Sequence, residues 1–148
     1  MKRHQALEPF SRDHNEALIL ARTLVENRPG AAEAFESLWV SELQDHLEQE
    51  ESLLGPLLDA ERLNRLRDEH ELIHGLKLKL PESANELGAM LEAHVRWEER
   101  ELFPYIESHA SQEQLGGLRL ATDVVEESRW NASPKRKELV ERRRRAEG

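Results

Sequence analysis

The sequence predicts an all-α fold, an antiparallel up-down four-helix bundle followed by a short C-terminal helix and a basic tail.

 Three observations carry this prediction. Apolar residues recur every three or four positions through most of the 148 residues, and two-residue alternation is nearly absent. The composition of 34% charged, 38% hydrophobic and 5% aromatic residues suits helices that cover one small core. Breaks containing Gly and Pro are short, so consecutive helices should run antiparallel. We expect one domain over residues 1–130, including the fifth helix, and a polar basic tail over 131–148.

The first three helices each have a start or stop signal. Pro9 is suited to the first turn of a helix, and Pro29-Gly30 should end that helix. A second helix follows and should end near Pro56. Asp59 can cap the N-terminus of a third helix.

The third helix ends ambiguously, and the fourth begins with a capping signal. Residues 76–80 alternate between Leu and Lys like a strand, but so short a run before a proline fits a fraying last turn better. Ser83 with Glu86 has the capping-box pattern for a fourth helix. Pro104 falls within that helix and should kink it, because proline lacks a backbone donor.

A fifth, shorter helix is expected from Ser111 to about Trp130. Ser111 with Gln114 can cap it, whereas two consecutive glycines should weaken it. The tail beyond it is net positive over residues 135–145, and we expect it to be solvated or helical rather than a docking arm.

Composition also excludes several classes of protein. A net charge of −9 opposes binding to phosphate backbones, so nucleic acid is not an expected partner. The absence of Cys excludes disulfides, thiolate metal sites and cysteine catalysis. No apolar run is long enough to span a membrane, and residues 1–10 lack the apolar core of a signal peptide. We therefore expect a cytoplasmic protein without a membrane partner.

Side chains that can bind metal lie on the apolar faces of the four expected helices. Three pairs are spaced four residues apart, which places both members of a pair on one face of a helix. Together with one single histidine, the candidates are His14, His46, Glu50, His70, His74, His94 and Glu98. Because the apolar faces point into the bundle, these side chains should converge on one interior.

A dinuclear metal centre explains this convergence better than a metal-free core does. Ionised carboxylates resist burial, and no Lys or Arg on these faces completes a network of ion pairs. In the metal-free alternative, protonated histidines would satisfy only part of the cluster. Five imidazoles and two carboxylates overfill one coordination sphere but suit two ions. Nitrogen and oxygen donors favour Fe, Mn or Zn, and we expect two iron ions.

A repeated frame relates the second and fourth helices. The segment HLEQEESLLGP, from His46 to Pro56, matches HVRWEERELFP, from His94 to Pro104. Both place two consecutive glutamates after a three-residue spacer and a proline ten residues after the histidine. The two helices therefore look like equivalent halves of one site.

With these motifs the sequence resembles the hemerythrin-like proteins, including the HHE cation-binding domains. The resemblance covers residues 10–106 and rests on a histidine in the first helix, His-x3-Glu in the second, His-x3-His in the third and His with a downstream carboxylate in the fourth. It implies two irons joined by an oxo or hydroxo group. The implied ligands are His70, His74 and His94 for one iron, His14 and His46 for the other, and Glu50 and Glu98 as bridges.

The carboxylate on the fourth helix has two candidates. Oxygen-carrying hemerythrins have an Asp five residues after the last histidine, where this sequence has Glu99, whereas Glu98 lies four residues after His94. Glu98 returns to within ~40° of the direction of His94, and Glu99 is displaced by roughly 140°. We expect Glu98 to bridge and Glu99 to face a helix flank or solvent, so that substitution of Glu99 changes only surface charge. Glu99 stays the alternative, because a long side chain could still reach the site.

The resemblance implies a non-haem di-iron protein that binds O2, or a related small diatomic ligand, reversibly for storage, delivery or sensing. Two alternatives remain: a di-iron enzyme or repair factor acting on peroxide, nitric oxide or iron–sulfur clusters, and a protein that sequesters metal. Whether the protein is an enzyme is left open. Leu91, one turn before His94, should add an apolar wall beside the metals.

Overall fold

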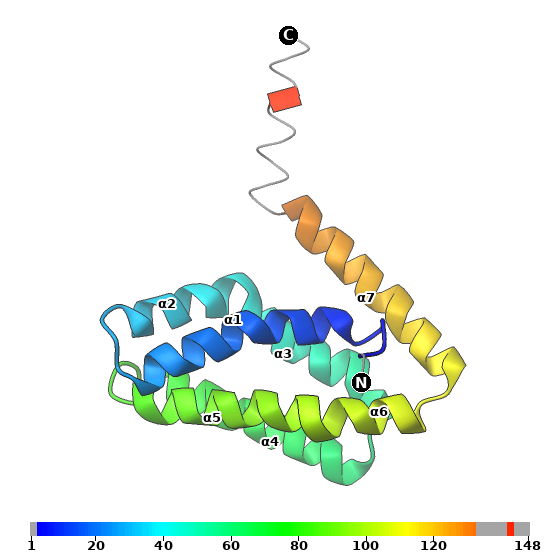
Figure 1. Cartoon of the computed structure of the whole chain (residues 1–148), viewed down its shortest axis with the longest axis horizontal. Helices are drawn as coiled ribbons and strands as arrows, with labels where there is room; N and C mark the ends of the chain where they lie inside the picture. The colour runs from blue at the N-terminus through cyan, green and yellow to red at the C-terminus, as the bar shows by residue number, and fades with distance from the viewer. Residues whose placement is uncertain (1–2, 133–141, 144–148) are drawn as a thin grey trace.

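The computed structural model describes residues 3–132 and 142–143 (Figure 1). Helices and turns account for their regular structure, and no strand occurs within these ranges. The all-α prediction is confirmed. Residues 133–141 and 144–148 of the expected basic tail lie outside the described residues.

The described chain forms a series of helical segments, two of which contain π-helical turns. The first segment is α1 (Glu8–Val25). The second contains α2 (Ala31–Leu38), the π-helical turn η1 (Trp39–Leu43), α3 (Gln44–Gln49), the π-helical turn η2 (Glu50–Leu54) and the 3-10 turn η3 (Gly55–Leu57). The third is α4 (Ala60–Lys77), and the fourth joins α5 (Ala84–Trp97), the π-helical turn η4 (Glu98–Leu102) and α6 (Phe103–His109). These segments lie alongside one another, and α7 (Gln112–Ala132) leaves them at an angle (Figure 1).

Two of the three expected helix caps are formed. Asp59 accepts a hydrogen bond of 2.9 Å from the backbone N–H three residues later, which caps α4. Ser111 and Gln114 bond each other's backbone N–H groups at 3.0 and 2.8 Å, the reciprocal arrangement of a capping box. The capping box expected at Ser83 is wrong, because its hydroxyl donates to the carbonyl of Leu76 instead.

Two further expectations concern the helix ends. Residues 76–80 form the end of α4 and a following turn, so the interpretation as a fraying last turn is right. The fifth helix is not short: α7 has 21 residues. Gly116 and Gly117 do not interrupt α7, because the helical backbone continues through both. No neighbouring atom lies within 4 Å of where a Cβ atom would be at either position.

Pro104 does not end the fourth segment, because it lies in the first turn of α6 directly after η4. A proline in a regular helix removes one hydrogen bond and clashes with the carbonyl four residues earlier. The wider π-helical turn before Pro104 changes that spacing. Pro56 stands in the same relation to η2, which extends the sequence repeat to the backbone.

The apolar core is divided into two clusters. One cluster is centred on Ala21, Phe35 and Leu87, and the other on Phe10 and Phe103. On α1, His14 lies in sequence between Phe10 of one cluster and Ala17 of the other, and on α4 His70 lies between Leu66 and Ile73 in the same way. The fold therefore buries a polar layer between two apolar ones.

Gly88 allows α5 to approach α1 closely. A Cβ atom at this position would lie 2.5 Å from the carbonyl oxygen of Ala21 and 2.8 Å from a methyl group of Val25. Because the first of these atoms belongs to the backbone, a side chain would force the helices apart. This contact helps to set the separation of the two helices that carry His14 and His94.

Within the described ranges, no helix combines the length and the apolar character needed to cross a lipid bilayer.

Candidate metal centre

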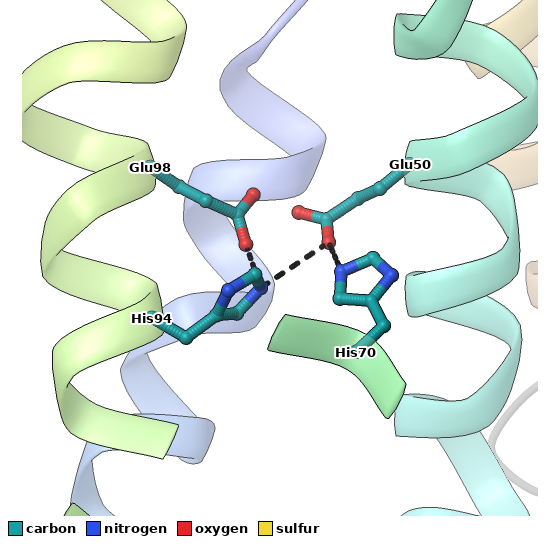
Figure 2. A group of neighbouring side chains, drawn as sticks. All are labelled: Glu50, His70, His94 and Glu98. Atoms are coloured by element: carbon teal, nitrogen blue, oxygen red, sulfur yellow. Dashed lines mark hydrogen bonds and ion pairs between the residues drawn. The ribbon is translucent and has the colours of Figure 1, made fainter. Parts of the chain in front are cut away.

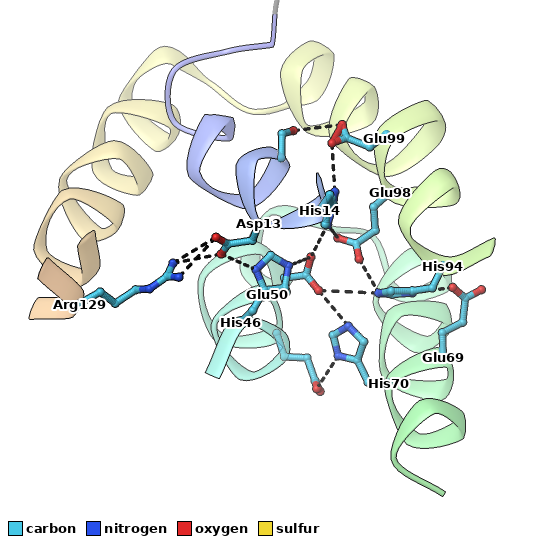
Figure 3. A network of polar contacts seen from close by, with 12 residues as sticks. Asp13, His14, His46, Glu50, Glu69, His70, His94, Glu98, Glu99 and Arg129 are labelled. Carbon is cyan, nitrogen blue, oxygen red and sulfur yellow. Dashed lines mark hydrogen bonds and ion pairs between the residues drawn. The ribbon is translucent and has the colours of Figure 1, made fainter. Parts of the chain in front are cut away.

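Most of the predicted ligands meet in one buried cluster (Figures 2 and 3). No member is more than 6% exposed. The members are His14 from α1, His46 from α3, Glu50 from η2, His70 from α4, His94 from α5 and Glu98 from η4. Each helical segment before α7 thus contributes at least one side chain to the cluster.

Glu50 lies between two pairs of histidines. Its Oε2 atom is 3.2 Å from Nε2 of His46 and 3.9 Å from Nε2 of His14. Its Oε1 atom is 3.0 Å from Nε2 of His70 and 3.8 Å from Nε2 of His94. One carboxylate is therefore shared between the two pairs, with one oxygen directed to each (Figure 3).

Glu98 connects the same two pairs from the opposite segment. Its Oε2 atom is 3.9 Å from Nε2 of His14, and its Oε1 atom is in ion-pair contact with Nε2 of His94. Neither oxygen of Glu98 has a hydrogen-bond partner among the described residues, and Nε2 of His14 and of His94 also have none. Buried polar atoms without partners are destabilising unless something else satisfies them.

The donor atoms fit metal ions in two overlapping groups. Those of Glu50, His70, His94 and Glu98 lie within 4.8 Å of one another, as do those of His14, His46 and Glu50. Two ligand atoms about 2.1 Å from one ion are about 3.0–3.4 Å apart at right to tetrahedral angles. The two shortest contacts of Glu50, at 3.0 and 3.2 Å, fall in that range. A metal ion would also satisfy the unpartnered atoms.

Without a metal, three histidines of the cluster, His14, His46 and His94, favour the protonated form. Burial lowers the pKa of His14, but the contacts with Glu50 and Glu99 outweigh burial and raise the pKa to about 9. Burial also lowers the pKa of His46, but the charge of Glu50 and the hydrogen bond with Asp13 outweigh burial and raise the pKa to about 10. A metal ion that binds these histidines at neutral pH would therefore displace protons from them.

The two buried glutamates differ in their acidity. Burial raises the pKa of Glu50, but the charge of His46 and hydrogen bonds lower it well below its usual value. Burial raises the pKa of Glu98, and the neighbouring charge of Glu50 raises it further. A metal cation beside Glu98 would favour its ionised form and so remove this difference in acidity between the two glutamates.

Each histidine of the cluster is also held from outside by a second carboxylate (Figure 3). The Nδ1–oxygen distances are 3.0 Å for His14–Glu99, His46–Asp13 and His70–Glu51, and 2.8 Å for His94–Glu69. An ionised carboxylate only accepts, so Nδ1 carries the proton and donates it. This leaves the inward Nε2 free to bind a metal, as outer carboxylates do at metal-bound histidines.

The outer carboxylates close a ring around the cluster. Asp13 of α1 holds the histidine of α3, and Glu51 of η2 holds that of α4. Glu69 of α4 holds the histidine of α5, and Glu99 of η4 holds that of α1. Each segment therefore orients a histidine on the next, and the last segment returns to the first.

Every outer carboxylate in turn contacts an arginine. The N–O distances are 3.0 Å for Arg3–Glu99, 3.1 Å for Arg129–Asp13, 3.5 Å for Arg67–Glu51 and 2.9 Å for Arg65–Glu69. Burial raises the pKa of Asp13, Glu69 and Glu99, but the histidine and arginine contacts outweigh it and lower all three. Asp13, Glu69 and Glu99 therefore stay ionised.

His74 is the predicted ligand that the structure does not bring to the cluster. Its side chain is exposed, and its ring stacks on Trp39 at 5.5 Å between centroids. The buried face of α4 contains Leu66, His70 and Ile73, so it continues on the side of Ile73 rather than on that of position 74. His70 is therefore buried and His74 is exposed, although the two are spaced four residues apart.

The structure distinguishes Glu98 from Glu99. Glu98 is 0% exposed and enters the cluster, as expected. Glu99 lies outside the inner cluster, as expected, but the expectation that its substitution changes only surface charge is wrong. Glu99 is half-buried and accepts hydrogen bonds from His14 and from the hydroxyl of Ser11 at 3.1 Å, in addition to its contact with Arg3.

Sequence reasoning missed the role of the four outer carboxylates in holding the histidines, although a pattern marks them. Only Glu99 was considered, as an alternative bridge. Asp13 and Glu69 directly precede His14 and His70, and the other two directly follow Glu50 and Glu98. An acidic residue beside a candidate ligand was therefore the available signal. It is ambiguous, because Asp45 also precedes a histidine of the cluster but is exposed.

Comparison with known proteins finds no matching family model, no matching curated protein and no matching solved structure. The functional argument therefore rests on the residues of this chain.

Proposed function

We propose that the protein is a dinuclear metal protein with the hemerythrin-like four-helix arrangement, and that it binds a small diatomic ligand such as O2 reversibly. One ion would be held by His70 and His94, the other by His14 and His46. Glu50 and Glu98 would be shared between them. The observation that carries the proposal is the position of Glu50, whose two oxygens face different histidine pairs.

The donor set favours iron among the metals that accept nitrogen and oxygen ligands. All inner donors are imidazole nitrogens or carboxylate oxygens, and the chain has no Cys. When bound, a pair of iron ions would supply the electrons needed to hold O2 reversibly. The residues provide the remaining requirements: they place the ions, balance their charge and exclude water.

A small void beside the cluster supports a ligand of diatomic size. It has a volume of about 10 Å³ and is lined by His14, His46, His94 and Glu98 on its polar side. Ala17, Leu43 and Leu91 are among the buried residues on its apolar side. This volume is about that of one water-sized probe, so only a very small ligand fits in the void.

The outer carboxylates support binding rather than acid–base chemistry. Each holds a proton at Nδ1 of a histidine and is itself paired with an arginine, so none of the four is free to act as an acid. Asp13 lines the void, but its oxygens are occupied by His46 and Arg129. The void is also lined by His14, His46, His94 and Glu98, which would be metal ligands in the loaded protein and would then carry no proton at the atoms facing the ions. This favours reversible binding over turnover.

The test is anaerobic reconstitution with ferrous iron, followed by optical spectra as O2 is added and removed. We expect a new charge-transfer band that appears with O2 and disappears when O2 is removed. Zinc-loaded protein is the matched control, because zinc has the same donors but no redox chemistry. Irreversible oxidation with turnover of O2 or peroxide would support the enzyme alternative. Iron binding without any response to O2 would support sequestration.

A further inference from the structure

The arginines behind the two halves of the cluster come from different parts of the fold. Behind His70 and His94, both arginines belong to α4, which itself carries His70. Behind His14 and His46, they come from outside the four segments that form the cluster. Arg3 precedes α1, and Arg129 lies near the end of α7. The two halves are therefore supported differently.

Arg129 joins α7 to the cluster through Asp13 (Figure 3). Its Nη1 atom donates to Asp13 at 3.1 Å, and Asp13 accepts from Nδ1 of His46 at 3.0 Å. Arg129 also contacts Glu126 at 3.3 Å on its own helix. Asp13 is only partly exposed, and its contact with Arg129 is therefore less screened than a surface ion pair.

α7 packs on the cluster-forming segments through a limited apolar contact. Its own residues Leu115, Leu118 and Thr122 are buried, whereas Leu120 and Val124 on its other face are exposed. Arg12 of α1 adds an ion pair with Glu126 at 3.4 Å. Arg129 also lies 3.8 Å from Glu42, so the arginine that orients a histidine of the cluster is one of the groups that hold α7 in place.

Arg3 supports the same half from the other end of the chain. It contacts the side chain of Glu99 at 3.0 Å and the backbone carbonyl of that residue at 2.8 Å. It also binds Glu107 at 2.7 Å, and its guanidinium lies 5.3 Å from the ring centroid of Phe103. Since Glu99 holds His14, both histidines of this half depend on a segment outside the cluster.

We propose that α7 and the N-terminal segment act as two clamps on the His14–His46 half of the centre, and that docking of α7 through Arg129 sets the metal affinity of this half separately from the other. The inference rests on the proposed dinuclear centre. Arg129 is a positioning residue: it fixes Asp13, which fixes the ring of His46. When α7 is displaced, Asp13 loses its partner and the imidazole loses its fixed orientation, whereas His70 and His94 keep theirs.

The experiment measures release of the two metal ions to a chelator in the full chain. Arg129→Gln removes the charge behind His46, and Arg65→Gln is the matched control, because Arg65 contacts Glu69 behind His94 in the same way. We expect Arg129→Gln to release one ion about 10-fold faster than the wild type while the second is unchanged, as for loss of an outer partner at a metal site. Arg65→Gln should accelerate the other ion.

A double substitution tests the route of the effect. If Arg129 acts through Asp13, Arg129→Gln should add nothing in an Asp13→Asn background, whereas independent effects would add. Additive effects would overturn the proposed route. Equal acceleration of both ions by Arg129→Gln, or no acceleration, would overturn the separate control of one half.

Nuclear magnetic resonance of the metal-free protein separates this inference from the proposed function. Arg129→Gln should shift the ring signals of His46 and leave those of His70 in place. Unchanged His46 signals would refute the clamp even in a protein that binds two ions. If Arg129→Gln shifts the His46 signals but the wild-type protein binds no metal, the dinuclear centre is refuted and the mechanical link between α7 and His46 is retained.

Discussion

The metal-free protein should lose stability as the pH rises from about 6.5 to 10. The pKa of His14 is raised from 6.5 to about 9 and that of His46 to about 10 in the folded protein. Because the folded state then binds more protons than the unfolded state, the stabilisation is fully present below pH 6.5. It is lost as the pH rises through the folded-state values.

The size of the effect follows from these pKa shifts. One pKa unit corresponds to about 1.4 kcal/mol, so the shifts correspond to about 3 kcal/mol for His14 and about 5 kcal/mol for His46. Both histidines depend on Glu50, and their contributions are therefore not additive. We expect a combined loss of about 3–5 kcal/mol in the free energy of unfolding.

Urea denaturation of the metal-free protein at a series of pH values measures this loss. Glu50→Gln keeps the shape of the side chain but removes the charge that both histidines face, so it should flatten the profile. His109→Gln is the control, because His109 is exposed and contacts Tyr105 outside the cluster. Stability that is constant or rises from pH 6.5 to 10, or a full loss retained in Glu50→Gln, would refute the reasoning.

The remaining predictions concern ligands and packing. Glu98→Ala should abolish binding of at least one metal ion, and Glu99→Ala should weaken binding by about 10- to 100-fold, both measured by competition with a chelator. Equal binding by Glu99→Ala and the wild type would contradict the role of the outer ring. His74→Ala should leave the metal content unchanged in elemental analysis, and a loss of one ion would place His74 among the ligands. Gly88→Ala should destabilise the protein by about 1–3 kcal/mol in thermal or urea unfolding, because its Cβ would meet the carbonyl of Ala21. Unchanged stability would show that the two helices can separate freely.

The inner cluster could be predicted from sequence because helical spacing decides which residues share a face. His46 with Glu50, and His94 with Glu98, lie one turn apart on buried faces, and the structure brings both pairs together. The same rule failed for His74. Spacing alone does not reveal how far the buried face of α4 turns along the helix, because that depends on the helices packed against it.

The outer ring could not be predicted because its contacts join residues that are distant in sequence. Glu99 binds His14 across 85 positions, and Arg129 binds Asp13 across 116. The angle of roughly 140° around the helix between His94 and Glu99 predicted correctly that Glu99 leaves the inner cluster. It did not reveal that α1 would lie on that side and present His14 to it.

The metal content of the reconstituted full chain tests the dinuclear centre most directly. Elemental analysis after removal of loosely bound metal should give two ions per chain in the wild type. A double variant, His14→Ala with His46→Ala, should retain one ion, because His70 and His94 still have Glu50 and Glu98 beside them. A wild-type protein that binds one ion or none under these conditions would contradict the account.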